Sequence, residues 1–372
     1  MATPAPAPGR LTSLDAFRGL TVAGMLLVNN PGSWSYVYPP LEHAEWNGWT
    51  PTDLIFPFFL FSVGISLSFS LARRREAGAD RRALLGKILR RGLLIILVGL
   101  LLNGFPRYDI AHMRFPGVLQ RIGAVYLVAA TLWVVASRRT VAAVTAALLL
   151  GYWALMTLVP VPGYGPGHLE PVGNLAQYLD AWLFAGHTWK AEWDPEGFLS
   201  TLPAIATCLL GALAGEGIRG RMPSLAVVRE LLGGGALLTV AGLGWGLWFP
   251  VNKSLWTSSY VVFTAGAALL GLGLCYWVME VAGRRRWAVP ALVFGVNPLL
   301  AFVGSGLMAR LLILVKVAGP DGPESLKQQL YRDGFASWLG PLNGSLGFAV
   351  VFVLVWLGLL WVPWRKGWVV KL

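Results

Sequence analysis

The sequence predicts an all-α integral membrane protein, a polytopic bundle of about ten transmembrane helices. Of its 372 residues, 56% are hydrophobic and only 13% are charged, and the mean hydropathy is +0.61. A helix needs about 20 apolar residues to cross a bilayer. Segments of this kind lie at residues 11–29, 54–72, 88–105, 115–136, 140–160, 198–217, 226–249, 256–281, 287–316 and 342–363. We expect a single membrane domain over residues 10–372, after a disordered Pro/Ala-rich tail at residues 1–9.

The net charge of +12 follows from how the basic residues are distributed among the loops. Arginine and lysine gather after the segments 54–72, 115–136, 198–217, 256–281 and 342–363, whereas the loops between these carry most of the acidic residues. The positive-inside rule then places both termini in the cytoplasm and the loop after residue 29 on the outer side of an inner (cytoplasmic) membrane. Anionic lipids attract such basic loops, so the charge requires no nucleic-acid partner.

The outward loop after the first helix runs directly into the second helix. It begins at Asn29, where an Asn-Asn-Pro-Gly stretch ends the helix, and it contains His43 and Glu45. Asp53 follows in the first turn of the second helix, in a segment with no further charge until Arg73. A carboxylate at the edge of hydrocarbon is costly, so we expect Asp53 to have a function or a charged partner.

Aromatic side chains are frequent in the same loop, which includes Trp34, Trp46 and Trp49. Two interpretations remain open. Tryptophan and tyrosine are enriched at the headgroup level of membrane proteins as an anchoring belt. Alternatively, aromatic faces bury the apolar side of a sugar ring or a similar polar ligand.

The fourth helix places Gln120 and Arg121 about 10 Å below the outer surface, at 1.5 Å of rise per residue. An arginine at this depth needs an anionic partner. Asp53, at the outer end of the second helix, is the candidate within the protein. A phosphate or carbonyl of a bound ligand is the functional alternative to such a structural pair.

Three further features lie towards the C-terminus. The outward loop 161–197 is long enough to be functional, but its histidines share no ligand spacing with the others, so we expect no metal site. Asn252 and Lys253 form a short outward hairpin, in which the lysine either binds an acidic group or is a solvated interface residue. We expect the helix over 287–316 to be broken at Asn297-Pro298 and at 304–306.

Five ordered blocks between residue 10 and about residue 265 carry a family resemblance. The blocks are RLTSLDAFRGLTVAGMLLVNN, HAEWNGWTPTDLIFPFFLFSVG, RFPGVLQRIG, DPEGFLSTLPAIATCLLGALAGE and VNKSLWTSSYVV. With them the chain resembles the transmembrane acetyltransferases related to heparan-alpha-glucosaminide N-acetyltransferase, as a bacterial-type member without the extra N-terminal portion and helix of the animal enzymes.

The resemblance implies transfer of an acetyl group from cytoplasmic acetyl-CoA to an amine, commonly that of a glucosamine-type sugar, on the outer side of the membrane. The position of the family's active-site histidine corresponds to His43. A neutral imidazole at this position can take the proton of an attacking amine, or can accept the acetyl group itself.

Roles for other residues follow as hypotheses. Asp53 or Glu45 would orient the imidazole, and Asn47 or Asn29 would polarise the thioester carbonyl. The remaining candidates for acceptor or donor binding are Trp46, Gln120, Arg121, Asn252 and Lys253. The coenzyme A phosphates would lie near Arg90, Arg91 or Arg284 on the cytoplasmic side, with the pantetheine arm in a tunnel towards His43.

Other functions stay open at this point. Ten helices with a buried arginine also suit a solute transporter or channel, although no internal repeat supports inverted halves. A scaffold subunit of envelope assembly, an acyltransferase with another cell-envelope acceptor, and a homodimer are further possibilities.

Overall fold

The computed structural model describes residues 11–190, 193–320 and 322–370, and the expected disordered tail at residues 1–9 lies outside the described residues. The described chain is mostly helical, with long loops and one small two-stranded sheet. Its internal contacts divide it into two units. Within the described residues, the first unit comprises 11–44, 50–56 and 274–370, and the second comprises 45–49 and 57–273.

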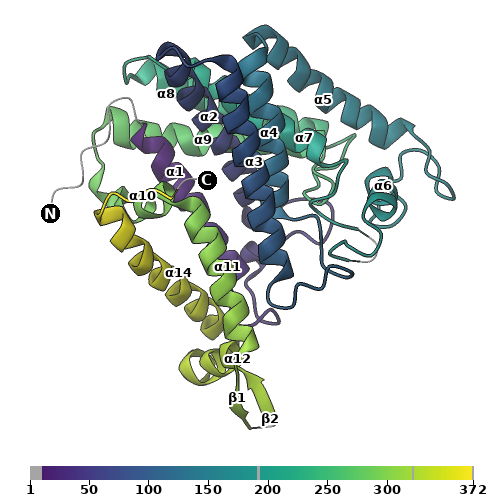
Figure 1. Ribbon diagram of the computed structural model, residues 1–372, viewed down its shortest axis with the longest axis vertical. Coiled ribbons are helices and arrows are strands. Elements are labelled where there is room, and N and C mark those ends of the chain that lie inside the picture. The colour runs from purple at the N-terminus through teal and green to yellow at the C-terminus, as the bar shows by residue number, and fades with distance from the viewer. Residues whose placement is uncertain (1–10, 191–192, 321, 371–372) are drawn as a thin grey trace. The chain divides into compact units, whose positions relative to one another are not determined.

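The first unit is built around α1 (Thr12–Asn29), which lies beside α10 (Val289–Val296), α11 (Pro298–Leu314) and α14 (Pro341–Arg365) (Figure 1). Two short 3-10 helices, η1 (Pro39–Leu41) and η2 (Pro51–Leu54), contact each other in the loop after α1. A small antiparallel hairpin leads from α11 towards α14, with Lys316 opposite Ser325. The other elements are η3 (Trp277–Val281), η4 (Arg286–Ala288), β1 (Lys316–Gly319), β2 (Gly322–Ser325), α12 (Leu326–Tyr331), η5 (Arg332–Ala336) and α13 (Ser337–Leu339).

Two glycines allow α1 and α10 to pack backbone to backbone. A Cβ atom on Gly19 would lie 1.7 Å from the Ala291 carbonyl oxygen, and one on Gly295 would lie 2.0 Å from that of Asp15. Arg18 closes the same contact, because its Nη1 donates to the Gly295 carbonyl at 3.1 Å and to Asp15 Oδ1 at 3.2 Å. Close approach of this kind is typical of helices packed in membranes.

The second unit contains most of α2 (Ile55–Glu76) and of α9 (Ser258–Tyr276). Helices α3 and α4 run side by side, and α7 packs on both α4 and α5 (Figure 1). Gly64 of α2 and Gly211 of α7 repeat the close approach seen at α1 and α10. The remaining helices are α3 (Arg81–Gly104), α4 (Val118–Val135), α5 (Arg138–Leu158), α6 (Leu175–Leu183), α7 (Thr201–Ile218) and α8 (Leu225–Trp245).

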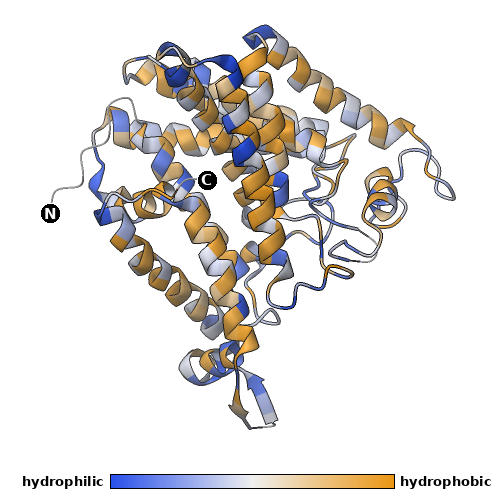
Figure 2. Ribbon diagram, viewed as in Figure 1, coloured by the Kyte–Doolittle hydropathy of each residue, from blue (hydrophilic) through white to orange (hydrophobic). Residues whose placement is uncertain are grey.

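The prediction of a helical membrane protein is confirmed. In the described part of the chain, seven helices are long and apolar enough to cross a bilayer, or eight if the bent pair α10 and α11 forms one span. Most turns of these helices are strongly apolar (Figure 2). Each of the ten expected segments overlaps a helix, but α1 and α3 fall outside the seven, and α3 carries five basic residues in its first half. The number ten and the cytoplasmic termini stay predictions.

The expected break in the ninth segment is confirmed at one of its two positions. Helices α10 and α11 meet at Asn297 with a bend of 72°. At 304–306 the expectation was wrong, because α11 continues without interruption from Pro298 to Leu314. The Asn297 side chain is fully buried at the bend, where it donates to the Trp368 carbonyl at 2.9 Å and accepts from the Val370 N–H at 2.8 Å. The chain after α14 is therefore attached to the helix break.

The glycine contact gives a testable expectation for stability. We expect Gly19→Ala to lower the melting temperature of the detergent-solubilised protein, because the new methyl group overpacks the α1–α10 contact at a typical cost of about 1–3 kcal/mol. The matched control is Gly151→Ala in α5, where an added Cβ would meet nothing within 4 Å and helix propensity favours alanine. Equal melting temperatures for Gly19→Ala and the unmodified protein would contradict the close packing.

Candidate active site

His43 and Asp53 form the most distinctive polar pair of the first unit. His43 lies just after η1, and Asp53 lies in η2 immediately before α2. The Nδ1 atom of His43 is 2.7 Å from Oδ1 of Asp53. The carboxylate is buried, with its side chain 1% exposed, whereas the imidazole side chain is 48% exposed. The buried carboxylate of Asp53 thus positions the half-exposed imidazole of His43.

The second oxygen of Asp53 is fixed by the backbone around it. Oδ2 accepts from the N–H groups of Ala44 and Thr50, each at 3.0 Å, and from the Thr50 hydroxyl at 3.2 Å. Thr50 and Asp53 form a capping box at the start of η2, and Pro51 occupies the first position of that turn. The Thr50 hydroxyl also lies 2.6 Å from the Glu42 carbonyl oxygen. The loop that carries His43 is therefore fastened to the helix start.

The geometry of this pair defines what the imidazole can do. A carboxylate that accepts several hydrogen bonds is stabilised as the anion, so it acts as acceptor and the His43 Nδ1 carries the proton. Nε2 then holds the lone pair and is the nitrogen that can act as base or nucleophile. This is the arrangement in which a buried aspartate sets the tautomer of a catalytic histidine.

Two further candidate residues, Asn47 and Asn252, which were predicted separately, are hydrogen-bonded to each other in the second unit. Oδ1 of Asn252 accepts from the Leu255 N–H at 2.8 Å, so its Nδ2 must be the donor to Oδ1 of Asn47 at 3.1 Å. The amide of Asn47 is then oriented with its NH2 group as the remaining donor. Asn252 is fully buried and Asn47 is exposed. Asn252 therefore positions Asn47, which is the member of the pair that a ligand can reach.

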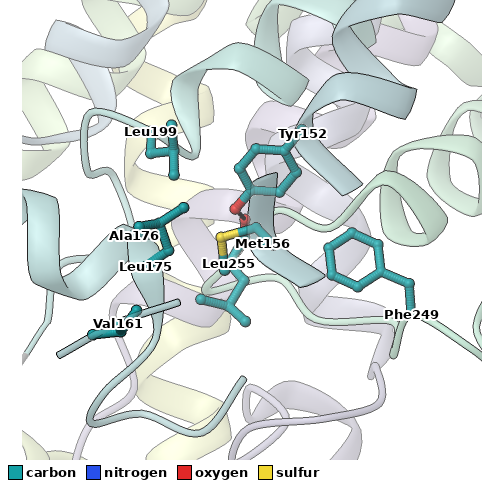
Figure 3. Packing of buried hydrophobic residues seen from close by; sticks show 8 residues of the cluster. All are labelled: Tyr152, Met156, Val161, Leu175, Ala176, Leu199, Phe249 and Leu255. Atoms are coloured by element: carbon teal, nitrogen blue, oxygen red, sulfur yellow. Dashed lines mark hydrogen bonds between the residues drawn. The ribbon is translucent and has the colours of Figure 1, made fainter. Parts of the chain in front are cut away.

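An apolar cluster supports the loops that carry Trp46 and Asn252. It joins α5, α6 and the segments before α7 and α9 (Figure 3). The Tyr152 hydroxyl donates to the Leu255 carbonyl at 2.5 Å within the cluster. Trp46 packs against it and donates its indole N–H to the Leu169 carbonyl at 2.9 Å. The cluster consists of Tyr152, Met156, Val161, Leu175, Ala176, Leu199, Phe249 and Leu255.

Arg121 is buried in α4, with 2% of its surface exposed. Its Nη2 donates to the Gly197 carbonyl at 3.1 Å and to the Ser200 hydroxyl, and its guanidinium lies 5.1 Å from the Trp256 ring. Its Nε and Nη1 atoms have no hydrogen-bond partner among the described residues. The negative charge that the sequence analysis assigned to Asp53 is supplied within this unit by carboxylates, namely Asp180, Asp194 and Glu196.

The carboxylates around Arg121 are organised by Arg114, just before α4. Arg114 binds Asp194 through two hydrogen bonds, at 2.7 Å from Nε and 2.5 Å from Nη2, and also binds Glu196. Burial lowers the pKa of the Arg114 guanidinium, but the two carboxylates outweigh burial and raise it overall. This pairing fixes the turn that precedes α7.

Asp180 is the third acid of this group and lies on α6, 2% exposed. The Phe198 N–H donates to its Oδ1 at 2.8 Å. Its Oδ2 lies against Gly197, where an added Cβ would come within 1.7 Å. Burial raises the pKa of Asp180 to about 7, although the hydrogen bond from Phe198 acts in the opposite direction.

The other predicted site residues occupy varied positions. Asn29 and Glu45 are exposed, and Lys253 is half-buried in the turn after Asn252. The Gln120 amide lies against Gly99 and Gly117, and its Nε2 has no hydrogen-bond partner among the described residues.

The three arginines predicted to bind coenzyme A are exposed. Arg90 and Arg91 lie on α3, and Arg284 lies between η3 and η4. The Arg91 guanidinium lies over the Tyr126 ring, 5.0 Å from its centre.

The histidines of the loop 161–197 bind backbone carbonyls. Nε2 of His168 lies 2.9 Å from the Val172 carbonyl oxygen, and Nδ1 of His187 lies 2.8 Å from that of Met113. Within residues 11–190, 193–320 and 322–370, no group of three or more His, Cys, Asp or Glu side chains could hold a metal ion. The loop also contains a helix, α6, that the sequence analysis did not expect.

Sequence reasoning missed the contributions of Arg114, Asp180, Ser200 and Trp256. One signal was available for Asp180, which is the single charge in the otherwise apolar and amphipathic stretch LAQYLDAWL. The backbone of Trp256, which has a φ of 53° although it is not glycine, has no comparable sequence signal.

The raised pKa of Asp180 predicts how stability depends on pH. In the unfolded chain an aspartate titrates near 3.9, so the folded protein binds the extra proton between about pH 4 and 7 and loses stability as the pH rises through that range. We expect Asp180→Asn to reduce the difference in melting temperature between pH 5 and pH 8. The control is Glu170→Gln, an exposed carboxyl of the same loop, which should leave the difference unchanged. An unchanged difference in Asp180→Asn would refute this assignment.

Comparison with known proteins gives consistent matches. The family model described as heparan-alpha-glucosaminide N-acetyltransferase, catalytic, matches residues 10–245. The chain is 32% identical over 359 residues to heparan-alpha-glucosaminide N-acetyltransferase of Homo sapiens, which covers 80% of this chain and 53% of the human protein. For the Mus musculus protein of the same name the identity is 31% over 357 residues, covering 79% and 53%. The chain thus spans about half the length of these curated relatives.

Proposed function

The chain belongs to the heparan-alpha-glucosaminide N-acetyltransferase family, and on this basis we propose that it is a membrane-embedded N-acetyltransferase. It would move an acetyl group from acetyl-CoA to the amine of a glucosamine-type sugar. The observation that carries the proposal is the His43–Asp53 pair, in which a buried carboxylate lies 2.7 Å from Nδ1 of a half-exposed imidazole. A hydrogen bond to this carboxylate favours the tautomer with the proton on Nδ1. Acetyl transfer to an amine requires a base of this kind.

In the direct mechanism, His43 acts as a general base. Its Nε2 takes a proton from the sugar amine while the amine nitrogen attacks the carbonyl carbon of the thioester. The electron pair of the C=O bond moves to oxygen and then returns as the C–S bond breaks. The coenzyme A thiolate takes the proton from the imidazolium, so the products are the N-acetyl sugar and free thiol. Asp53 stabilises the imidazolium throughout, as an ion that already accepts hydrogen bonds from Ala44 and Thr50.

Asn47 is the proposed donor to the carbonyl oxygen. Its Oδ1 is occupied by Asn252, so its NH2 group is the part that can donate. A preoriented donor stabilises negative charge that develops on the carbonyl oxygen and needs no reorganisation during the reaction. Asn47 follows His43 by four residues along the chain.

Arg121 provides a further electrostatic contribution. The Nε and Nη1 atoms of this buried guanidinium, which have no hydrogen-bond partner among the described residues, suit an oxygen of a bound ligand, such as a carbonyl or phosphate. The exposed arginines Arg90, Arg91 and Arg284 would bind the coenzyme A phosphates.

We further propose that donor and acceptor enter from opposite sides of an inner membrane, with His43 outward and both termini cytoplasmic, as the distribution of basic loops favours. Trp46, Glu45, Asn29, Gln120 and Lys253 stay proposed contacts of the acceptor, and a homodimer stays open.

A second mechanism uses the same residue differently. Nε2 of His43 would attack the thioester itself, and the acetyl-imidazole would then pass its acetyl group to the amine. Labelled acetyl-CoA without acceptor separates the two mechanisms. Labelled protein that is lost in His43→Ala supports the covalent route, and release of thiol only when amine is present supports direct transfer.

The exchange Asp53→Asn tests the pair without removing the helix cap. The amide oxygen can still accept from Ala44 and Thr50, but the NH2 group then faces His43 Nδ1 and forces the proton onto Nε2. We expect kcat for acetyl transfer, measured as thiol release in liposomes with acetyl-CoA and glucosamine, to fall by about 10²–10⁴-fold. His43→Ala should fall at least as far.

His112 and Asp109 offer a matched control. They form a similar pair, with 2.9 Å between Nδ1 and Oδ2, but both side chains are largely exposed. Asp109→Asn and His112→Ala should leave kcat unchanged. If Asp53→Asn and Asp109→Asn change kcat to the same extent, the proposed role of His43 is wrong. If the unmodified protein releases no thiol with any amine, a transporter is favoured instead.

A further inference from the structure

The Trp46 ring meets two indole rings of the long loop 161–197 in the second unit. The Trp46 and Trp193 rings are 5.4 Å apart and nearly perpendicular, and the Trp189 and Trp193 rings are 5.5 Å apart in the same arrangement. We call Trp46, Trp189 and Trp193 the tryptophan triad. Trp189 is 56% exposed, and the other two are partly buried. The triad therefore presents aromatic surface while its inner members are packed.

Hydrogen bonds hold the triad in place. Oδ2 of Asp194 accepts from the Trp189 N–H at 2.8 Å, and the same carboxylate is bound by Arg114. The Lys190 N–H donates to the Trp193 carbonyl at 3.2 Å. The Trp46 indole is anchored on the Leu169 carbonyl. A buried ion pair thus fixes the backbone on which two exposed or half-exposed rings stand.

The ring faces attract positive charge. The Lys190 ammonium lies 5.3 Å from the centre of the Trp189 ring and 5.2 Å from that of Trp193. Both distances are within the range of cation–π attraction. A ligand that carries an ammonium group and an apolar ring face could make a cation–π contact and a stacking contact with these indoles.

We propose that the tryptophan triad is the subsite for the sugar ring of the acceptor, an amino sugar such as glucosamine. The inference rests on the proposed function. Trp46 follows His43 by three residues, so their Cα atoms are at most about 11 Å apart. The aromatic residues near His43 then serve recognition as well as any anchoring in the headgroup layer.

The exchange Trp189→Ala tests this subsite. It removes an exposed ring, and we expect the KM for glucosamine to rise roughly three- to ten-fold, as loss of an aromatic contact predicts, with kcat and the KM for acetyl-CoA unchanged. Trp189→Phe, which keeps a ring face, should restore part of the affinity. The control is Trp182→Ala on α6, a tryptophan that is 77% exposed and outside the triad, which should leave all three constants unchanged.

A binding measurement separates this inference from the proposed function. Saturation-transfer NMR on the full chain in detergent, with glucosamine and without acetyl-CoA, should show transfer to the sugar protons that weakens in Trp189→Ala and not in Trp182→Ala. If acetyl transfer occurs but the KM for glucosamine is unchanged in Trp189→Ala, the subsite is wrong and the function stands. If no acetyl transfer occurs but the Trp189-dependent signal is present, the subsite stands and the function fails. No saturation transfer to glucosamine in the unmodified protein would overturn the subsite.

Discussion

In the first unit, the buried carboxylate of Asp53 both stabilises the local fold and orients the candidate catalytic histidine. A buried anion is tolerated only when hydrogen bonds replace the water that it loses. Here Ala44, Thr50 and His43 supply those bonds, and each of them comes from a segment whose position matters to the site. The requirement to satisfy one acid therefore fixes the loop after η1, the start of the second helix and the orientation of the imidazole at the same time.

The second unit also contains buried charged groups that need partners, and it has more of them than the first unit's Asp53 site. Arg114 and Arg121 lie near the start of α4. Asp194 and Glu196 act on both arginines, and Asp180 acts on Arg121 as well. The acids come from α6 and from the turn before α7, so their attraction to the arginines ties the long loop to the helices. The tryptophan triad depends on the same network, because Asp194 holds the backbone of Trp189. Electrostatic pairing in this unit thus shapes a surface that is itself mostly uncharged.

Much of the fold could be predicted because a bilayer imposes a length on apolar segments, and each of the ten segments overlaps a helix. The break at Asn297 was also predictable, since Asn-Pro is a strong helix-ending signal. The glycines at 304 and 306 wrongly suggested a helix break, because glycine also occurs inside helices where they pack closely together. The short helix α6 was missed because its nine residues lie inside a long loop and are far too few to suggest a membrane span.

The candidate site could be predicted only where its members are close in sequence. His43, Asn47 and Asp53 lie within one block. His43 and Asp53 are paired by a local hydrogen bond, whereas Asn47 is oriented by Asn252, 205 residues further along the chain. Trp46 and Trp193 are far apart in the chain, and no pattern in the residues links them. The acids around Arg121 were equally hidden, because charge counting cannot tell which carboxylate a fold brings near a given arginine.

The bend at Asn297 has a consequence for the end of the chain. A helix that turns by 72° exposes peptide groups in a region with little water, and a fully buried amide side chain there must also find partners. Backbone groups of residues 368 and 370 are these partners. The segment after α14 therefore stabilises the break between α10 and α11, some 70 positions earlier in the chain. Loss of these two contacts would leave both polar ends of the buried Asn297 amide without their partners, so the position of residues 368–370 is linked to the shape of the helix break.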